Sequence, residues 1–345
     1  MSKILIIRFS ALGDVAMTIP VIYSFAREFP MHEITVLSRD YVQPLFQDLP
    51  SNVRFIGADL CGKHKGISGL NVLYKELQVE KFNYVADFHS VLRTQYLRLR
   101  FKLDGVSTAS ICKGRSEKKK LTRRNNKVLV QLKSNFIRYH EVLDKLGFRF
   151  DLGFNSIFDN RDTDFQEIVS ETGEKKDLKW IGIAPFATHK GKIYPLELQE
   201  KVIAYFANDI RVKVFIFGGG KEEEDIVKGW CATHPSLKSM VGKLKLSQEL
   251  SLMSQLDLMY SMDSANMHLA SLVNTPVISL WGATHPYAGF MGWNQSLEHA
   301  IQVDLSCRPC SIYGQIPCYR KDYACLYQIS PENIIHHIEK ALFDL

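Results

Sequence analysis

Short apolar stretches alternate with segments of helical length along most of the chain. A run of four to eight apolar residues is typical of a buried strand, whereas apolar residues three or four positions apart indicate a helix. In the first half, the strand candidates are residues 3–9, 33–38, 84–89 and 109–113, and the helix candidates are residues 18–30 and 70–80. This alternation predicts an α/β fold with parallel sheets that helices cover on both faces.

The alternation stops across residues 113–175, where charged residues, Asn, Asp and Gly accumulate. It restarts in the second half, and a final helix is predicted over residues 330–345, with Ser330 at the N-cap and Pro331 at the first helical position. A chain of 345 residues suits two domains. We therefore place a boundary in the polar stretch before Lys179. The strand candidates of the second half are residues 180–186, 213–220, 256–262 and 275–282.

Composition and charge narrow the class of protein. The chain is 46% hydrophobic and 23% charged, which is ordinary for a globular protein, and no apolar run approaches the ~20 residues of a membrane span. No secretory signal is evident, so we expect a cytoplasmic protein. The formal net charge is +6, and residues 115–127 contain seven Lys or Arg and one Glu. This basic run is either a solvated loop or a contact for anionic lipid or a phosphorylated acceptor. It lacks the interleaved aromatic residues that nucleic-acid binding favours.

The loop after the first strand contains Ser10, Gly13 and Asp14 and leads into a helix. The glycine-rich dinucleotide fingerprint is absent. Gly13 permits a tight turn and a close approach of a ligand. Asp14 has two interpretations: it caps the helix, or it faces a cleft and takes a proton from an attacking hydroxyl.

The loops after two strands of the second half have the composition of a nucleotide site. Residues 185–195 include Thr188 and Lys192, which suit a pyrophosphate. Three glycines around Gly219 precede an acidic stretch that begins at Glu222. An acid at that place accepts hydrogen bonds from ribose hydroxyls, although a plain turn with an acidic first helical turn explains it equally well.

Two more loops follow at the same predicted sheet edge. Asp263 and Ser264 stand where a strand gives way to a helix, so Ser264 can cap the helix and its N–H groups can meet an anion. His268 follows one turn later, where a histidine is commonly structural. Gly282 and Thr284 end the next strand in a loop of small and hydroxyl residues.

Together these motifs resemble the lipopolysaccharide heptosyltransferase family, glycosyltransferase family 9. The resemblance rests on S-A-L-G-D after the first strand, K-x-[WY]-P at residues 192–195, and D-S-x-x-x-H-L-A at residues 263–270, followed by P-V-I-x-L-[WY]-G-x-T-x-P. Residues 84–95, with Asp87 and Arg93, are similar to a further family motif. The likeness extends from residue 3 to about residue 340. The family usually has Thr-Gly after the donor-loop aspartate, whereas this chain has Ser264 and Ala265.

The resemblance implies a GT-B architecture, in which two Rossmann-like domains of doubly wound parallel sheets face a cleft. It implies an acceptor-binding domain at residues 1–175, a nucleotide-sugar domain at 176–328, and a final helix at 329–345 that crosses back to the first domain. The implied reaction is an inverting transfer of heptose from ADP-heptose to a lipid-linked saccharide, at the inner face of a membrane. No DxD pair follows a strand, so we expect no metal or other cofactor.

The family's residues carry over to this chain one by one. The resemblance makes Asp14 the general base and Lys192 the ligand of the phosphates. It assigns Ser10, Gly13 and Arg93 to the acceptor. The basic run 115–127 would meet the acceptor or lipid headgroups. The donor residues that the resemblance implies are Lys192, Asp263, Ser264 and His268. The chemistry of the loops after the strands adds Thr188, Gly219, Glu222, Gly282 and Thr284 to the expected donor site.

Four late cysteines are spaced C-x2-C-x7-C-x6-C, at Cys307, Cys310, Cys318 and Cys325. In a cytoplasmic chain they are free thiols or, because four thiolates hold zinc, a structural metal site. The second pair is too widely spaced for a standard zinc ribbon, which favours free thiols.

Two other functions stay open on the sequence. One is a GT-B transferase with a different nucleotide-hexose donor, because a few side chains set donor identity. The other is a non-catalytic nucleotide-sugar-binding protein, which the joint presence of Asp14, Lys192, Asp263 and His268 disfavours.

Overall fold

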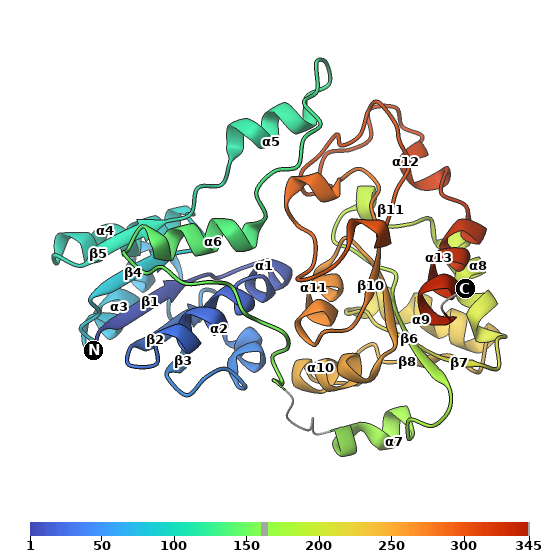
Figure 1. Cartoon of the computed structure of the whole chain (residues 1–345), viewed down its shortest axis with the longest axis horizontal. Helices are drawn as coiled ribbons and strands as arrows, with labels where there is room; N and C mark the ends of the chain where they lie inside the picture. The colour runs from blue at the N-terminus through green and yellow to red at the C-terminus, as the bar shows by residue number, and fades with distance from the viewer. Residues whose placement is uncertain (160–164, 344–345) are drawn as a thin grey trace. The chain divides into compact units, whose positions relative to one another are not determined.

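Two parallel sheets with covering helices organise the chain (Figure 1). The computed structural model describes residues 1–159 and 165–343. The residues group into two units by their contacts: the first contains Met1–Lys113 and Ser134–Ile157, and the second contains Gly114–Lys133 and Phe158–Leu345.

The first unit has a parallel sheet with strand order β3-β2-β1-β4-β5. Leu5 and Ile7 of the central strand pack into the cluster that includes Leu70, Leu73 and Leu97 of the helices. The alternate residues of that strand are fully buried too, because a parallel sheet is covered on both faces. The elements are β1 (Lys3–Ile7), α1 (Leu12–Ala16), α2 (Ile19–Glu28), β2 (Glu33–Ser38), η1 (Asp40–Phe46), β3 (Val53–Gly57), α3 (Gly66–Gln78), β4 (Tyr84–Asp87), α4 (Leu92–Leu103), β5 (Ser107–Ser110) and α6 (Asn135–Asp144).

The second unit has a parallel sheet with strand order β11-β10-β9-β6-β7-β8. Read from its other edge, this is the doubly wound order 3-2-1-4-5-6 of a Rossmann fold. Its elements are α5 (Arg115–Thr122), η2 (Phe165–Ile168), α7 (Val169–Thr172), β6 (Lys179–Ala184), η3 (Lys190–Lys192), α8 (Leu196–Ala207), β7 (Val212–Ile216), α9 (Lys221–Thr233), β8 (Lys238–Ser239), α10 (Leu246–Gln255), β9 (Leu258–Met262), α11 (Ala265–Leu272), β10 (Val277–Leu280), η4 (Pro286–Ala288), η5 (Leu297–His299), β11 (Ala300–Ile301), α12 (Ala324–Tyr327) and α13 (Pro331–Phe343).

The predicted fold class is confirmed, and the predicted strands coincide with observed ones to within a few residues. The weakest prediction was residues 109–113, since β5 occupies Ser107–Ser110. Strand β3 and the short strands β8 and β11 were not predicted from the apolar pattern.

The basic run was expected to be a loop or a contact surface, and most of it forms helix α5. Within this helix Leu121 and Lys118 are buried. The helix and the residues after it, together Gly114–Lys133, belong by their contacts to the second unit. We call this segment the basic hairpin, because Val128 N–H returns to donate to Lys120 O at 3.1 Å. The observed division therefore differs from a single boundary at residue 175.

The final helix begins as the sequence predicts. Ser330 Oγ accepts a hydrogen bond from Asn333 N–H at 3.2 Å, and Pro331 is the first helical residue. Ile334, Ile338 and Leu342 form the buried face of α13, which packs against α8 and β9. These contacts lie within the second unit, so the expected crossing to the first domain stays a prediction. The last two predicted helical positions, 344–345, lie outside the described residues.

Candidate functional site

Each sheet has one place where strand order reverses, and there the loops that follow two neighbouring strands diverge. In doubly wound sheets this point forms a ligand-binding crevice. In the first unit it lies between β1 and β4, and in the second between β6 and β9. The loops after these strands contain Asp14 in the first unit, and Lys192 and Asp263 in the second.

In the first unit, Asp14 is held by two donors. Arg8 Nη2 lies 2.9 Å from Asp14 Oδ2, and Ala11 N–H donates to the same oxygen at 3.3 Å. The helix-capping interpretation is therefore correct in part, because Asp14 closes the first turn of α1. Both contacts within the described residues fall on Oδ2, and 25% of the side chain is exposed. The second oxygen, Oδ1, makes no hydrogen bond or ion pair within the described residues.

Arg8 was not singled out from the sequence, although it stands two residues before Ser10. Its side chain is largely buried and it bridges the two loops of the crevice, because Nη1 donates to Phe88 O at 2.9 Å while Nη2 meets Asp14. A guanidinium that binds the loop after β4 and the carboxylate after β1 fixes one relative to the other. Tyr139 adds a hydrogen bond from its hydroxyl to Asp14 O at 3.3 Å.

The other acceptor candidates of the first unit lie around this loop. Ser10 and Gly13 are partly buried, and Gly13 lies within α1. Arg93 is exposed in the first turn of α4. Asp87 is fully buried at the end of β4, where Oδ1 accepts the N–H groups of His89 and Ser90 at 2.9 and 2.7 Å.

In the second unit, Lys192 and Asp263 form an ion pair. Lys192 Nζ lies 3.1 Å from Asp263 Oδ2, and their side chains are 16% and 7% exposed. The loops after β6 and β9 are thereby joined by two charges in a nearly buried place. Such a pair keeps the ammonium group in position before a ligand arrives.

Glycines allow the loops around Lys192 to approach one another. Ala283 N–H donates to Gly191 O at 2.8 Å. A Cβ on Gly282 would lie 2.6 Å from that carbonyl oxygen, and a Cβ on Gly314 would lie 2.5 Å from Cγ of Lys192. Gly282 is therefore required for close packing of backbone on backbone.

Ser264 occupies the N-cap position of α11, but its side chain makes no capping hydrogen bond. Its hydroxyl lies 3.3 Å from the hydroxyl of Ser261 instead. The predicted capping by Ser264 is wrong, and the N–H groups that begin α11 remain suited to an anion. His268 lies buried within the same helix.

The remaining donor candidates differ in their placement. Thr188 and Glu222 are exposed, in the loop after β6 and the first turn of α9. The acid that contacts the glycine loop is Glu223, whose Oε2 accepts Gly219 N–H at 2.7 Å. Burial raises the pKa of Glu223. Thr284 is fully buried, and its hydroxyl has no hydrogen-bond partner among the described residues.

Arg308 organises the loop that contains Gly282 and Thr284. Its side chain is buried and donates to Gly282 O at 2.6 Å, to Trp281 O and Thr284 O at 3.0 Å, and to Val303 O. A single guanidinium therefore satisfies several carbonyl groups of one loop. Arg308 was not predicted from the sequence, because only the cysteines on either side of this residue form a spacing pattern that indicates chemistry.

The four late cysteines are free thiols, and Cys325 is buried. Among residues 1–159 and 165–343, no group of three or more His, Cys, Asp or Glu side chains is arranged to hold a metal ion. Cys310 N–H donates to Ala283 O at 3.1 Å, which ties the cysteine segment to the loop that contains Gly282 and Thr284. Burial raises the pKa of the Cys325 thiol to about 12, so this thiol stays protonated at neutral pH.

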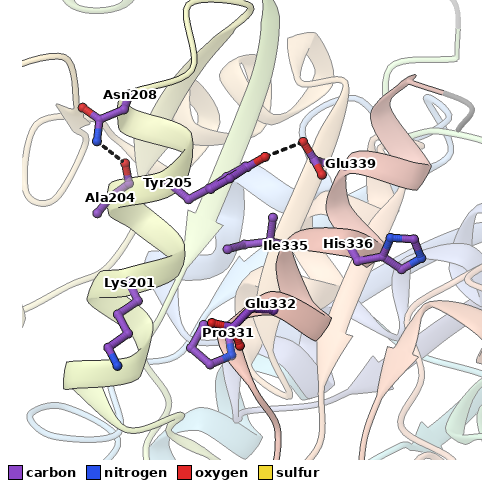
Figure 2. Close-up of a pocket in the computed structure, with 9 residues that line it drawn as sticks. All are labelled: Lys201, Ala204, Tyr205, Asn208, Pro331, Glu332, Ile335, His336 and Glu339. Atoms are coloured by element: carbon purple, nitrogen blue, oxygen red, sulfur yellow. Dashed lines mark hydrogen bonds between the residues drawn. The ribbon is translucent and has the colours of Figure 1, made fainter.

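A separate groove of about 440 Å³ lies between α8 and α13 (Figure 2). Its walls include Lys201, His336 and Tyr205, whose hydroxyl donates to Glu339 Oε1 at 2.7 Å. None of the candidate site residues lines it.

These features define a class of protein before any comparison. GT-B glycosyltransferases typically have two Rossmann-like units. In this chain one unit contains the carboxylate of Asp14, bound by Arg8, and the other contains Lys192 near the N-terminus of α11. Residues 109–317 match the family model described as glycosyltransferase family 9 (heptosyltransferase). The chain belongs to this family and is a glycosyltransferase. The matched range includes Lys192 and Asp263, whereas Asp14 lies outside it.

Individual relatives are more distant. The lipopolysaccharide core heptosyltransferase OpsX of Haemophilus influenzae is 26% identical over 291 residues, which cover 81% of this chain and 79% of that protein. The lipooligosaccharide heptosyltransferase 2 of Campylobacter jejuni is 24% identical over 171 residues, 48% of this chain and about half (52%) of that protein. The structure of E. coli ADP-heptose lps heptosyltransferase II matches with a TM-score of 0.73 at 15% identity, covering 99% of each chain. At that identity the likeness shows the fold.

No helix in the described part of the chain is both long and apolar enough to cross a bilayer.

Proposed function

We propose that this protein transfers heptose from ADP-heptose to the core saccharide of lipopolysaccharide, with inversion at the anomeric carbon. The observation that carries the proposal is the Lys192–Asp263 pair at the reversal point of the second sheet. The names of the relatives, a lipopolysaccharide core heptosyltransferase and an ADP-heptose lps heptosyltransferase, supply the substrates.

Asp14 would act as the general base. The acceptor hydroxyl gives its proton to Oδ1 while its oxygen bonds to the anomeric carbon, and the bond from that carbon to the phosphate oxygen breaks. Arg8 holds the carboxylate through Oδ2 at 2.9 Å, so the other oxygen has a fixed direction. Ser10, Gly13 and Arg93 would line the acceptor side, since Gly13 precedes Asp14 in α1 and Ser10 stands in the loop just before this helix.

The second unit would bind the donor. The leaving group is a nucleoside diphosphate, whose developing charge needs fixed donors. Lys192 supplies a cation, and the uncapped N–H groups at the start of α11 supply a partial positive charge. Thr188, Gly219, Glu222, Asp263, Ser264, His268, Gly282 and Thr284 would complete the donor site, with no metal. Transfer requires the acceptor and donor loops to meet during catalysis.

A thermal-shift panel tests the donor. Binding of ADP or ADP-heptose to the folded protein should raise Tm as the ligand concentration rises. A preference for UDP or GDP would retain the reaction type and assign another nucleotide-hexose donor. No shift with any nucleotide, with or without acceptor present, would favour the non-catalytic alternative.

The acceptor is anchored to lipid, so we further propose a cytoplasmic enzyme that works peripherally at the inner membrane face. Three of the seven cations in the basic run 115–127 are already engaged: Lys118 lies 4.5 Å from the ring of Phe290, Arg124 lies 4.1 Å from the ring of Tyr319, and Lys127 donates to backbone. The exposed cations that remain for anionic headgroups are Arg115, Lys119, Lys120 and Arg123.

Co-sedimentation with vesicles of anionic lipid tests this contact. Substitution of the four exposed cations by Gln should weaken binding, and more so at low salt than at high salt. A variant with four exposed cations removed from α8, α9 and β8, namely Lys201, Lys221, Lys228 and Lys238, is the matched control. Equal binding by the hairpin variant and the wild type would refute the membrane contact.

A further inference from the structure

We propose that His89 binds the acceptor saccharide, by donating a hydrogen bond from Nε2 to an acceptor oxygen beside Asp14. This inference rests on the proposed glycosyl transfer. His89 lies in the loop after β4, on the side of the crevice opposite the loop that contains Asp14.

The backbone of His89 is held firmly. Asp87 Oδ1 accepts the N–H groups of His89 and Ser90, and Asp87 is fully buried. Ser90 has a φ of +48°, a left-handed conformation that reverses the chain directly after the histidine. The loop is therefore fixed at the place where it meets the loop after β1.

The ring is oriented by a second contact. Phe9 N–H donates to His89 Nδ1 at 3.4 Å, and the two rings meet edge to face with centroids 6.4 Å apart. A nitrogen that accepts a hydrogen bond in an uncharged imidazole leaves the proton on the other nitrogen. Nε2 is then a donor. It has no hydrogen-bond partner among the described residues, and His89 is partly exposed.

Burial, together with the cations nearby, keeps the ring uncharged. Burial, together with Arg8 and Lys113, lowers the pKa of His89 to about 3, against the opposing effect of Asp14; Arg39 adds to the lowering. At neutral pH the imidazole is thus a hydrogen-bond donor and a very weak base. The role of base stays with Asp14, and His89 is left to recognise a hydroxyl or anionic oxygen, which the nearby cations also favour.

Two substitutions separate this role from a purely structural one. In His89→Asn, the amide oxygen can take the place of Nδ1 and accept Phe9 N–H, but no atom reaches the place of Nε2. In His89→Gln, the amide nitrogen reaches the place of Nε2 and can donate there. Asn thus keeps the contact within the protein, and Gln keeps the contact to the acceptor.

The probe is a heptose-free core oligosaccharide released from lipopolysaccharide, with its affinity measured by calorimetry and its turnover measured with ADP-heptose. We expect His89→Asn to weaken oligosaccharide binding about 3- to 10-fold, the loss of one hydrogen bond between uncharged groups, and His89→Gln to restore most of it. The Tm shift with ADP should not change in either variant.

Several results would overturn the assignment. Wild-type affinity in His89→Asn, or an equal loss in both variants, would show that His89 only supports the loop. A wild-type affinity that changes with an inflection near pH 6.5, and that loses this inflection in His89→Gln, would show that the ring titrates and is charged when it binds. A wild-type protein that neither binds nor glycosylates the oligosaccharide would instead refute the proposed function itself.

Discussion

Replacement of Lys192 by Met should separate the stability that the Lys192–Asp263 pair provides from the donor affinity that Lys192 provides. Methionine keeps an apolar stem of similar length and removes the charge. Asp263, 7% exposed, would then be a nearly buried carboxylate without its cation. Breaking a buried pair from one side costs about 3–5 kcal/mol, and because Lys192 is 16% exposed we expect about 3 kcal/mol of unfolding free energy to be lost.

The double variant Lys192→Met with Asp263→Asn provides the control. Removal of both charges leaves no unpaired ion, so we expect stability to return to within about 1 kcal/mol of the wild type. Donor affinity should not return with it. A hydrogen bond to a charged group contributes about 1.5–3 kcal/mol, which corresponds to a rise of about 10- to 150-fold in the Kd for ADP.

Urea unfolding and calorimetric titration with ADP measure the two quantities independently. The reasoning is refuted if the double variant binds ADP as tightly as the wild type, because Lys192 would then be a structural cation only. The claim that the pair stabilises the fold is refuted if Lys192→Met unfolds at the same urea concentration as the wild type, because the pair would then contribute nothing to stability.

Three further predictions concern the loops that position the site. Lys127→Met removes hydrogen bonds from Nζ to Cys307 O and Pro309 O at 2.8 and 2.9 Å, and should lower the unfolding free energy measured in urea by about 1–3 kcal/mol. The control Arg123→Met, at an exposed position, should change that free energy by less than about 0.5 kcal/mol, and equal effects of the two substitutions would contradict the prediction. Gly282→Ala places a Cβ 2.6 Å from Gly191 O, so ADP affinity should fall, and an unchanged Kd would count against this packing. Burial and Arg308 lower the pKa of His285 to about 4. As the pH drops from about 6.5 towards 4, the unfolded state therefore binds a proton that the folded state does not, and the unfolding free energy should fall. Urea titrations at each pH should show a smaller fall in His285→Asn, and the same dependence of unfolding free energy on pH in both proteins would refute this prediction.

The sequence predicted the fold well because parallel strands buried on both faces are continuous apolar runs. Such runs at β1, β6, β9 and β10 are unmistakable. Strand β3, with the sequence VRFIG and an exposed Arg54, lacks this signal because it lies at the sheet edge. The basic hairpin was misjudged because its helix is stabilised by a few contacts, such as Lys118 over Phe290, that join residues far apart in the chain.

The sequence predicted candidate site residues that directly follow strands. It did not predict residues whose importance depends on contacts with distant parts of the chain. Lys192 and Asp263 were both selected, although nothing in the sequence indicated that they pair with one another. Arg8 and Arg308 were missed, because a cation at a strand end or between two cysteines has no spacing that identifies its partners. His89 was missed for a similar reason, since its role depends on Phe9, 80 residues earlier.

The measurement that tests the account most directly is sugar transfer by wild-type and Asp14→Asn protein. Both would be incubated with ADP-heptose and a heptose-free core oligosaccharide, and the product would be followed by mass spectrometry. We predict that the wild type adds one heptose, and that Asp14→Asn loses at least about 100-fold in kcat, as for a general base, while its Tm still rises with ADP. Transfer by Asp14→Asn at the wild-type rate would contradict the assignment of the base, and no transfer by the wild type would contradict the proposed reaction.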